Sequence, residues 1–323
     1  HGGLDEAALR EHEEVTKVKN VNTVYLGRAA METWYFSPFP AETVPPDRAP
    51  LDALYFCQYT LRFFRHESEL RRWQRRPNLL RHPPGNEIYR HNGLAMFEVD
   101  GAHEKIYCEN LSYFAKLFLD HKTLYYDTEC FLFYIMCEID DWGYNPVGYF
   151  SKEKYSETGY NLACILTFPA FQKRGFGRFL IEFSYALSVL EEKVGSPEKP
   201  LSDLGLVSYR SFWAARLLRR LRDHPRPTVS VTDLARATSI VAEDVVYTLQ
   251  YLGVLKYVGG AYILTLLPEI LDDLLQKYPE KEPRVNVDKI HWTPPITSEL
   301  LKFGKDDKYS IHSKKQPAED IGH

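Results

Sequence analysis

The sequence has few cysteines, no long apolar run and no large excess of charge of either sign. Its 323 residues include five cysteines, and no two of them form a Cys-x-x-Cys pair. A chain of this size with an odd, small number of cysteines is not a disulfide-stabilised scaffold, and this favours a reducing compartment, the cytosol or the nucleus. The longest uncharged apolar run, residues 131–137, is far too short to cross a bilayer, so no membrane partner is expected.

The charge balance excludes a surface that is basic throughout. Lys and Arg number 40 and Asp and Glu number 44, which gives a formal net charge of −4. Contact with nucleic acid must therefore come from local patches. Residues 61–90 hold eight arginines against three glutamates, and residues 210–226 hold six arginines against one aspartate. These stretches are consistent with DNA or nucleosome contact, and equally with solvated charged faces.

What the sequence does have is apolar and aromatic material for a large core. Apolar residues make up 44% of the chain and aromatic residues 14%. The length favours about two domains. Alternating apolar residues begin at residue 21 and predict a β region up to residue 90, preceded by a polar linker at 1–20.

The middle of the chain, residues 91–205, reads as a mixed α/β core. Strands are predicted at 94–99, 105–107, 130–139, 146–150 and 161–168, with a helix at 111–120 and a longer helix at 175–193. After a helix at 205–222, two short helices at 233–237 and 242–252 precede a hairpin around Gly259-Gly260. Two helices and a wing predict a winged-helix-like region within 206–295, and 296–323 reads as a disordered tail.

The segment 172–178, QKRGFGR, stands between a predicted strand and the long helix. Its two glycines allow close approach of backbone amides, and a helix amino terminus favours an anion such as the pyrophosphate of coenzyme A. Lys173, Arg174 and Arg178 add positive charge. The segment is not a P-loop and lacks the third glycine of the dinucleotide fingerprint. Taken alone, it is equally consistent with a simple tight turn.

Three further residues have chemistry that a transferase could use. Glu198 lies in a loop stiffened by two prolines and is a candidate general base, or a solvated turn charge. Cys164 lies within a predicted strand and is either a thiol that faces a thioester or a small core residue. Lys122 follows the helix at 111–120 and is, by spacing alone, an ordinary exposed lysine.

Several long segments resemble the MYST histone acetyltransferases, most closely the Esa/MOF-type branch. The resemblance runs from about residue 15 to 295. It rests on WYFSPFP at 34–40, HPPGNEIYR at 82–90, KLFLDHKTLY at 116–125, VGYFSKEK at 147–154, ACILT at 163–167 and VGSPEKPLSDLG at 194–205.

The resemblance implies a fold and a set of functional residues. The implied fold is α/β (α+β): a GNAT-like mixed-sheet acetyltransferase core, an N-terminal β and finger region, and a C-terminal winged-helix-like region. Glu198 matches the family's general base, Cys164 its active-site cysteine and Lys122 its autoacetylated lysine. The implied acetyl-CoA contacts are Ile165, Leu166, Thr167, Gln172, Lys173, Arg174, Gly175, Phe176, Gly177, Arg178, Ser202 and Ser211.

The finger region departs from the family pattern of Cys-Cys-His-Cys zinc ligands. Cys57 remains, but the later ligand positions fall at Thr60, Trp73 and Pro77, which are neither thiolates nor imidazoles. We therefore expect a finger-shaped segment held together by aromatic residues, with no zinc and no other metal in the chain.

The function implied by the resemblance is acetyl transfer from acetyl-CoA to lysine ε-amines of histone tails, with histone H4 expected and other core histones allowed. Direct transfer with Glu198 as base is favoured over a route through an acetylated Cys164, because acetyl-CoA is already an activated thioester. The family resemblance also implies nuclear localisation, chromatin regulation and assembly with enhancer-of-polycomb-like and ING-type subunits. The alternative function is a non-catalytic scaffold that binds nucleosomes or DNA.

Overall fold

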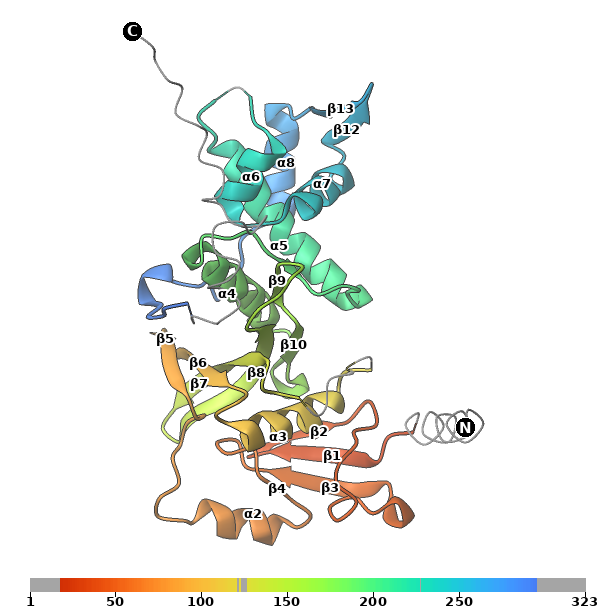
Figure 1. The fold of residues 1–323 in the computed structure, drawn as a ribbon, viewed down its shortest axis with the longest axis vertical. Helices are drawn as coiled ribbons and strands as arrows, with labels where there is room; N and C mark the ends of the chain where they lie inside the picture. The colour runs from red at the N-terminus through yellow and green to blue at the C-terminus, as the bar shows by residue number, and fades with distance from the viewer. Residues whose placement is uncertain (1–17, 121, 123–126, 227, 295–323) are drawn as a thin grey trace. The chain divides into compact units, whose positions relative to one another are not determined.

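The computed structural model describes residues 18–120, 122, 127–226 and 228–294 (Figure 1). The chain divides into two compact units. The first comprises residues 1–151 and 166–174, and the second comprises residues 152–165 and 175–323. The predicted tail at 296–323 lies outside the described residues, as does the predicted linker at 1–20 apart from its last three residues. The domain boundaries expected from the sequence stay predictions.

The first unit begins with a four-stranded mixed sheet. Strands β1 (Val21–Leu26), β2 (Ala29–Glu32), β3 (Leu51–Phe56) and β4 (Phe63–Phe64) lie in the order β2-β1-β3-β4. β1 runs parallel to β3 and antiparallel to β2, and the ring of Tyr25 stacks on that of its partner Tyr55. Helix α2 (Glu67–Gln74) follows β4, and the Trp73 ring lies 5.9 Å from the Phe64 ring. Strand structure therefore begins at residue 21, as predicted.

A five-stranded sheet follows, in the order β10-β8-β7-β6-β5. Its strands are β5 (Asn86–His91), β6 (Leu94–Asp100), β7 (Phe131–Asp140), β8 (Gly143–Glu153) and β10 (Cys164–Thr167). Every residue from 131 to 137 in β7 is buried, which explains why the longest apolar run of the sequence lies in this strand. The strands predicted at 94–99, 130–139 and 146–150 are confirmed.

Helix α3 (Lys105–Lys116) corrects two of the predicted elements. The stretch 105–107 forms its first turn and not a strand, because the buried residues Tyr107, Leu111 and Phe114 follow a helical spacing. The helix stops at residue 116, four residues before the predicted end. The Leu117 carbonyl accepts hydrogen bonds from the amides of Trp34 and Tyr35, both at 2.9 Å, so the chain beyond Lys116 is bonded to a different segment.

The second unit contains a short parallel pair of strands, β9 (Tyr160–Leu162) and β11 (Ser196–Pro197). The sequence predicts one strand over 161–168, but the structure divides this run at Ala163. The reason is that the two halves have different partners: β9 pairs with β11, and β10 pairs with β8. Continuous hydrophobicity could not reveal this change of partner.

Helices α4 (Phe176–Leu190) and α5 (Asp203–Arg222) form the core of the second unit. Both agree with the predicted helices at 175–193 and 205–222 to within a few residues. The Trp213 indole donates a hydrogen bond of 2.8 Å to the Tyr185 hydroxyl, and the Tyr185 ring stacks on Phe212 at 5.3 Å. Aromatic residues therefore join the two helices, which accounts for part of the aromatic content.

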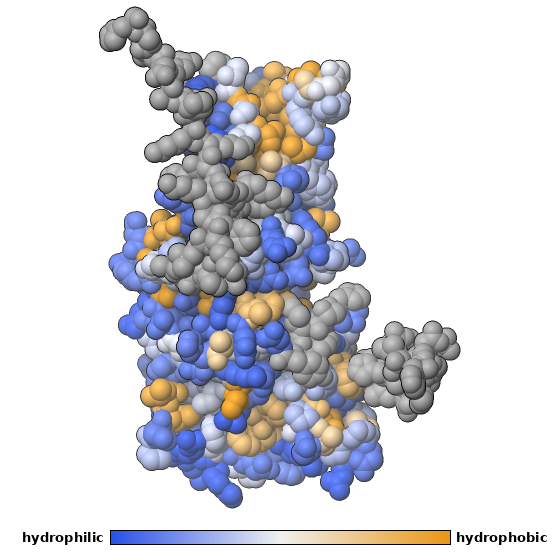
Figure 2. Space-filling model, viewed as in Figure 1, coloured by the Kyte–Doolittle hydropathy of each residue, from blue (hydrophilic) through white to orange (hydrophobic). Residues whose placement is uncertain are grey.

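The predicted pair of short helices and the hairpin are confirmed within the second unit. They are α6 (Val231–Thr238), α7 (Ala242–Tyr251), and the antiparallel strands β12 (Leu255–Val258) and β13 (Ala261–Leu264). Helix α8 (Pro268–Lys277) follows and was not predicted. Leu234, Val245 and Leu249 are buried in the same core as Trp213. Figure 2 shows apolar surface where β12, β13 and α8 lie, and Val258, Ile263 and Leu267 are exposed there.

Together the sheets and helices confirm the predicted α/β (α+β) class. No helix among the described residues has both the length and the apolar character needed to cross a bilayer.

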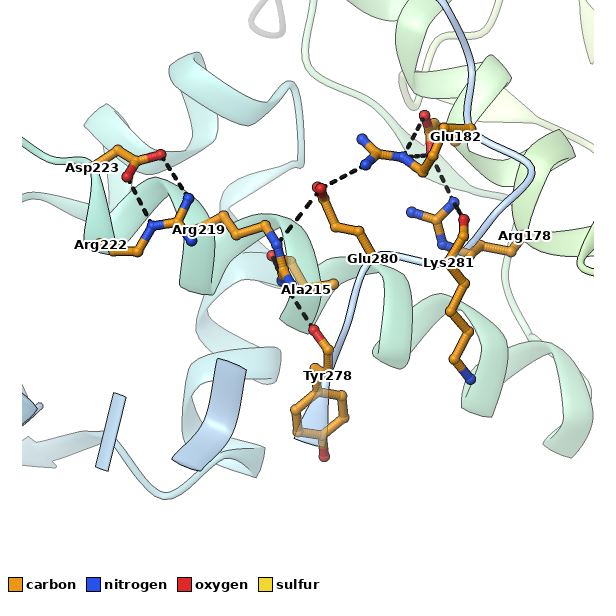
Figure 3. Close-up of polar contacts among 10 residues, drawn as sticks. Arg178, Glu182, Ala215, Arg219, Arg222, Asp223, Tyr278, Glu280 and Lys281 are labelled. Carbon is orange, nitrogen blue, oxygen red and sulfur yellow. Dashed lines mark hydrogen bonds and ion pairs between the residues drawn. The ribbon is translucent and has the colours of Figure 1, made fainter. Parts of the chain in front are cut away.

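An ion-pair network fastens the segment after α8 to helices α4 and α5 (Figure 3). Glu182 of α4, whose side chain is only 4% exposed, accepts hydrogen bonds from Arg178 at 2.8 Å and from the amide of Val285 at 2.9 Å. The Arg284 guanidinium lies 3.2 Å from the same carboxylate and also pairs with Glu280. Arg219 of α5 donates to the Tyr278 carbonyl at 2.9 Å. Residues 278–285 are therefore bonded to both helices.

We predict that Glu182→Gln destabilises the protein by about 3 kcal/mol, because it leaves two arginines without the buried carboxylate that they share. The urea midpoint of unfolding should fall accordingly. Asp223→Asn is the control, because Asp223 forms an exposed pair with Arg222 in the same region (Figure 3). It should leave the midpoint unchanged. Equal midpoints for both variants would contradict a stabilising role for Glu182.

Candidate functional site

The loop that carries Glu198 is bonded to the rest of the second unit on both sides of this residue. On one side, the Gly195 amide donates to the Ser239 carbonyl at 2.8 Å, and the Val241 amide donates back to Gly195 at 3.2 Å. On the other side, the Glu198 amide donates to the Leu162 carbonyl at 2.8 Å. The backbone at Glu198 is thus fixed at the end of the β9–β11 pair.

Cys164 lies two residues after Leu162, at the first position of β10. Its side chain is half-buried and its thiol is not part of a disulfide. Glu198 is also half-buried. Because the Glu198 amide is bonded to Leu162, the structure brings together the two chain segments that carry the predicted catalytic residues, within one compact unit.

The first predicted acetyl-CoA segment lies on β10. Leu166 is buried, whereas Ile165 and Thr167 are half-buried. The Gln172 side-chain amide donates to the Thr167 carbonyl at 3.0 Å. Thr167 and Gln172, both in the first unit, therefore lie next to each other.

The second predicted segment is a turn into α4, and its glycine at 175 is required by the backbone. Gly175 has φ +82° and caps the helix, and Lys173 has φ +64°. A Cβ at position 175 would lie 2.7 Å from the Glu282 carbonyl oxygen. A side chain here would therefore strain the turn and displace the segment after α8. Phe176 and Gly177 form the first turn of α4, with Phe176 buried.

Two of the three cations predicted to bind phosphate have partners in the protein. Arg174 forms a bidentate pair with Glu138, with nitrogen–oxygen distances of 2.8 and 2.5 Å, and these bonds raise the pKa of its guanidinium. Arg178 is bonded to Glu182 and to the Lys281 carbonyl. Lys173 is exposed. Carboxylates of the protein therefore neutralise two of the three positive charges that the sequence alone predicts for binding the cofactor.

The remaining predicted residues lie elsewhere in the fold. Ser202 caps α5, and its hydroxyl accepts a hydrogen bond from the Gly205 amide at 3.0 Å. Ser211 is exposed on the same helix. Lys122 is only 8% exposed, so it is not the ordinary exposed lysine that spacing alone allows. No observation assigns a cofactor contact to either serine, and these roles stay predictions.

Asp244 is a buried carboxylate beside the Glu198 loop that the sequence reasoning missed. It lies in the first turn of α7 and is 5% exposed. The Ser196 hydroxyl donates to it at 2.6 Å, and the Lys199 ammonium lies 3.2 Å away. Burial raises the pKa of Asp244, and the bonds from Ser196 and Lys199 partly oppose this shift. The sequence contains a signal for this buried carboxylate. Asp244 stands one position before Val245 and four before Thr248, on the apolar face of a predicted helix.

Comparison with known families corrects the expectation about zinc. Residues 18–76 match the family model described as the MYST family zinc finger domain. This finding contradicts the prediction that the chain holds no zinc. That prediction rested on four ligand positions, whereas the match extends over the whole segment from β1 to α2.

The structure itself assigns no ligand set to this domain. At the positions expected for ligands, the Trp73 indole donates to the Thr60 hydroxyl at 3.0 Å, and Cys57 is buried. Within the described part of the chain, no three His, Cys, Asp or Glu side chains are grouped so as to hold a metal.

Curated relatives are similar over most of this chain. It is 52% identical over 294 residues to "Histone acetyltransferase of the MYST family 2" of Arabidopsis thaliana, which covers 91% of this chain and 64% of the relative. It is 45% identical to histone acetyltransferase ESA1 of Yarrowia lipolytica over 90% of this chain and 61% of the relative. The Tip60 homolog of Caenorhabditis elegans is 47% identical, with 87% and 61% covered. The chain spans less than two thirds of the length of these relatives.

The model of the MOZ/SAS family matches residues 82–291, which include β6 to β13, the Glu198 loop and the turn into α4. The resemblance to the MYST enzymes is confirmed, and with it the GNAT-like acetyltransferase fold. The chain belongs to the MOZ/SAS family.

Proposed function

We propose that the protein transfers the acetyl group of acetyl-CoA to lysine ε-amines of histone tails, with Glu198 as the general base. The observation that carries this proposal is the 2.8 Å bond from the Glu198 amide to Leu162, two residues before Cys164. It supports a carboxylate fixed beside the strand that carries the predicted acetyl-CoA contacts. The names of the relatives support the substrate class.

The chemistry explains why a base is needed. A lysine amine with a pKa of about 10.4 is neutral in only about one molecule in a thousand near pH 7, which is a deficit of about 4 kcal/mol. Acetyl-CoA supplies an activated thioester, but an ammonium group cannot attack it. A fixed carboxylate at Glu198 accepts the proton from the amine and so supplies the nucleophile. The amine nitrogen then forms a bond to the acetyl carbon, the carbon–sulfur bond of the thioester breaks, and coenzyme A leaves as a thiolate that takes up a proton.

The turn at 172–178 suits the pyrophosphate of acetyl-CoA. It ends at the amino terminus of α4, whose amides and positive dipole end favour an anion. Lys173 is exposed and adds a cation. Since Arg174 and Arg178 are bonded to carboxylates, we assign recognition of the phosphates mainly to backbone amides and Lys173.

We predict that Glu198→Gln lowers the rate of acetylation of a histone H4 tail peptide at neutral pH by about 10²–10⁴-fold. Part of the loss should be recovered at high pH, because the substrate amine then deprotonates without help. The measurement is kcat as a function of pH. Glu157→Gln, at an exposed position between β8 and β9, is the control and should match the unchanged protein. Full activity of Glu198→Gln at neutral pH would refute the assignment of the base.

We predict that Cys164→Ala keeps kcat within about tenfold at saturating acetyl-CoA, since direct transfer does not need a second thioester. The enzyme should follow sequential rather than ping-pong kinetics. A loss as large as that of Glu198→Gln, together with an acetylated Cys164 detected by mass spectrometry, would establish the covalent route instead.

The proposal extends to partners and location. Histone tails in nucleosomes are the expected substrates, with histone H4 first among them, and Lys122 is proposed as a site of autoacetylation. The resemblance supports nuclear localisation and work within a multiprotein complex that contains enhancer-of-polycomb-like and ING-type subunits. Mass spectrometry of reconstituted nucleosomes after incubation with acetyl-CoA would identify the modified lysines. Faster acetylation of spermidine than of a histone tail would contradict the substrate class.

The alternative, a non-catalytic nucleosome-binding scaffold, depends on the basic stretches. In the stretch 210–226, Arg219 and Arg222 are paired with carboxylates. In the stretch 61–90, Arg72 and Arg75 are exposed on and next to α2. We propose α2 as one surface that contacts DNA, in addition to catalysis and not in its place.

We predict that the double variant Arg72→Ala/Arg75→Ala acetylates nucleosomes more slowly but a free histone tail peptide at the normal rate, because phosphate contacts matter only when DNA is present. The difference should shrink as salt rises. Arg222→Ala, which removes a paired arginine, is the control. Equal loss on peptide and nucleosome would argue against DNA contact at α2.

A further inference from the structure

The buried carboxylate of Asp244 is bonded to two residues of the loop, Ser196 before Glu198 and Lys199 after it. Asp244 Oδ2 accepts from the Ser196 hydroxyl at 2.6 Å, and Asp244 Oδ1 lies 3.2 Å from Lys199 Nζ. These loop residues stand two positions before and one position after Glu198. The carboxylate itself is on α7, 48 residues away from Ser196 along the chain.

Because the Asp244 carboxylate is buried, its contacts favour one conformation of the loop at 195–199. A carboxylate that is 5% exposed is costly unless its lone pairs are bonded and its charge is balanced. Among the described contacts, the Ser196 hydroxyl and the Lys199 ammonium provide both. The cost is therefore offset only when the loop occupies the position seen here, so Asp244 favours one loop conformation over the others.

Stability alone does not explain the carboxylate. Helix α7 is already packed through Val245 and Leu249, which are buried in the core of the second unit. A buried ion pair adds little net stability compared with apolar residues of the same size. Asp244 instead holds the loop in position. The loop's own strand, β11, has only two residues.

Backbone bonds and side-chain bonds both act on the loop around Glu198. The backbone bonds of Gly195 and Glu198 fix the two ends of the segment. Between them, Ser196 and Pro197 pair with β9 through an irregular register. The bonds to Asp244 are side-chain restraints that hold this stretch from the side of α7, next to the residue that is proposed to meet the substrate amine.

We propose that Asp244 is a positioning residue for the general base. It holds the loop at 195–199 through Ser196 and Lys199 and so fixes the direction of the Glu198 carboxylate. The inference rests on the proposed role of Glu198. It makes α7, an element of the winged-helix-like region, part of the catalytic apparatus.

The test uses the full chain with acetyl-CoA and a histone H4 tail peptide. Asp244→Ala removes both bonds and should lower kcat by about 10²-fold, the effect expected for a reacting group displaced by about 1 Å. Asp244→Asn retains an acceptor for Ser196 and should lose clearly less. In both variants, KM for acetyl-CoA should stay within about threefold, because the turn at 172–178 is untouched. Glu243→Gln changes the exposed carboxylate next to Asp244 and is the matched control, expected to be unchanged.

A double-mutant cycle separates positioning from a general structural effect. If Asp244 acts through Glu198, then Asp244→Asn in the Glu198→Gln background should lower the residual rate by no more than about twofold. A purely structural role would lower it by the same factor in both backgrounds. Such additivity would overturn the inference.

Ser196→Ala covers the case in which Asp244→Ala does not fold. It removes one donor from the loop side and leaves the buried pair with Lys199 in place. Its kcat should fall several-fold, and its urea midpoint should fall only slightly because the pair with Lys199 remains. Full kcat for both Ser196→Ala and Asp244→Asn, while Glu198→Gln is inactive, would overturn the inference and leave the proposed function intact. An active Glu198→Gln would refute both.

Discussion

The candidate site depends on a short parallel pairing in the second unit. Strand β11 contributes only Ser196 and Pro197 to the pair with β9, yet this pairing sets the register of Glu198 against Leu162. The close fit leaves no room at Gly195, where a Cβ would lie 2.7 Å from the Asn161 side chain. A larger residue there would push β11 away from β9 and move the carboxylate with it.

A second constraint is the balance of charge around α4. Glu182 is buried and shared by Arg178 and Arg284, so the arginine in the first turn of α4 is bound within the protein. The same segment brings the Glu282 carbonyl against Gly175. The chain after α8 thereby restrains the backbone at Gly175, and under the proposed function an anion there would meet backbone amides in a fixed arrangement. Pre-arranged donors bind more effectively than mobile side chains, because little order has to be imposed on binding.

Elements with a strong local signal could be predicted from the sequence, and elements defined by distant partners could not. The apolar face of α4, the buried run of β7 and the hairpin at Gly259-Gly260 are all local patterns. The division of 161–168 at Ala163 reflects a change of strand partner, which periodicity does not encode. The zinc expectation was wrong for a related reason: it judged the domain by a few ligand positions, whereas the whole segment carries the family relationship.

The same distinction applies within the candidate site. The motif around Glu198 is contiguous and could be identified from the sequence, but a motif does not state which element it is bonded to. Asp244 lies 45 residues beyond Lys199, on a helix that the sequence assigns to a winged-helix-like region. Because the buried carboxylate needs the loop and the loop needs the carboxylate, each fixes the other. Under the proposed role of Glu198, the contiguous motif works only when a distant part of the chain has folded against it, and this gives a physical reason for the two regions to occur in one compact unit.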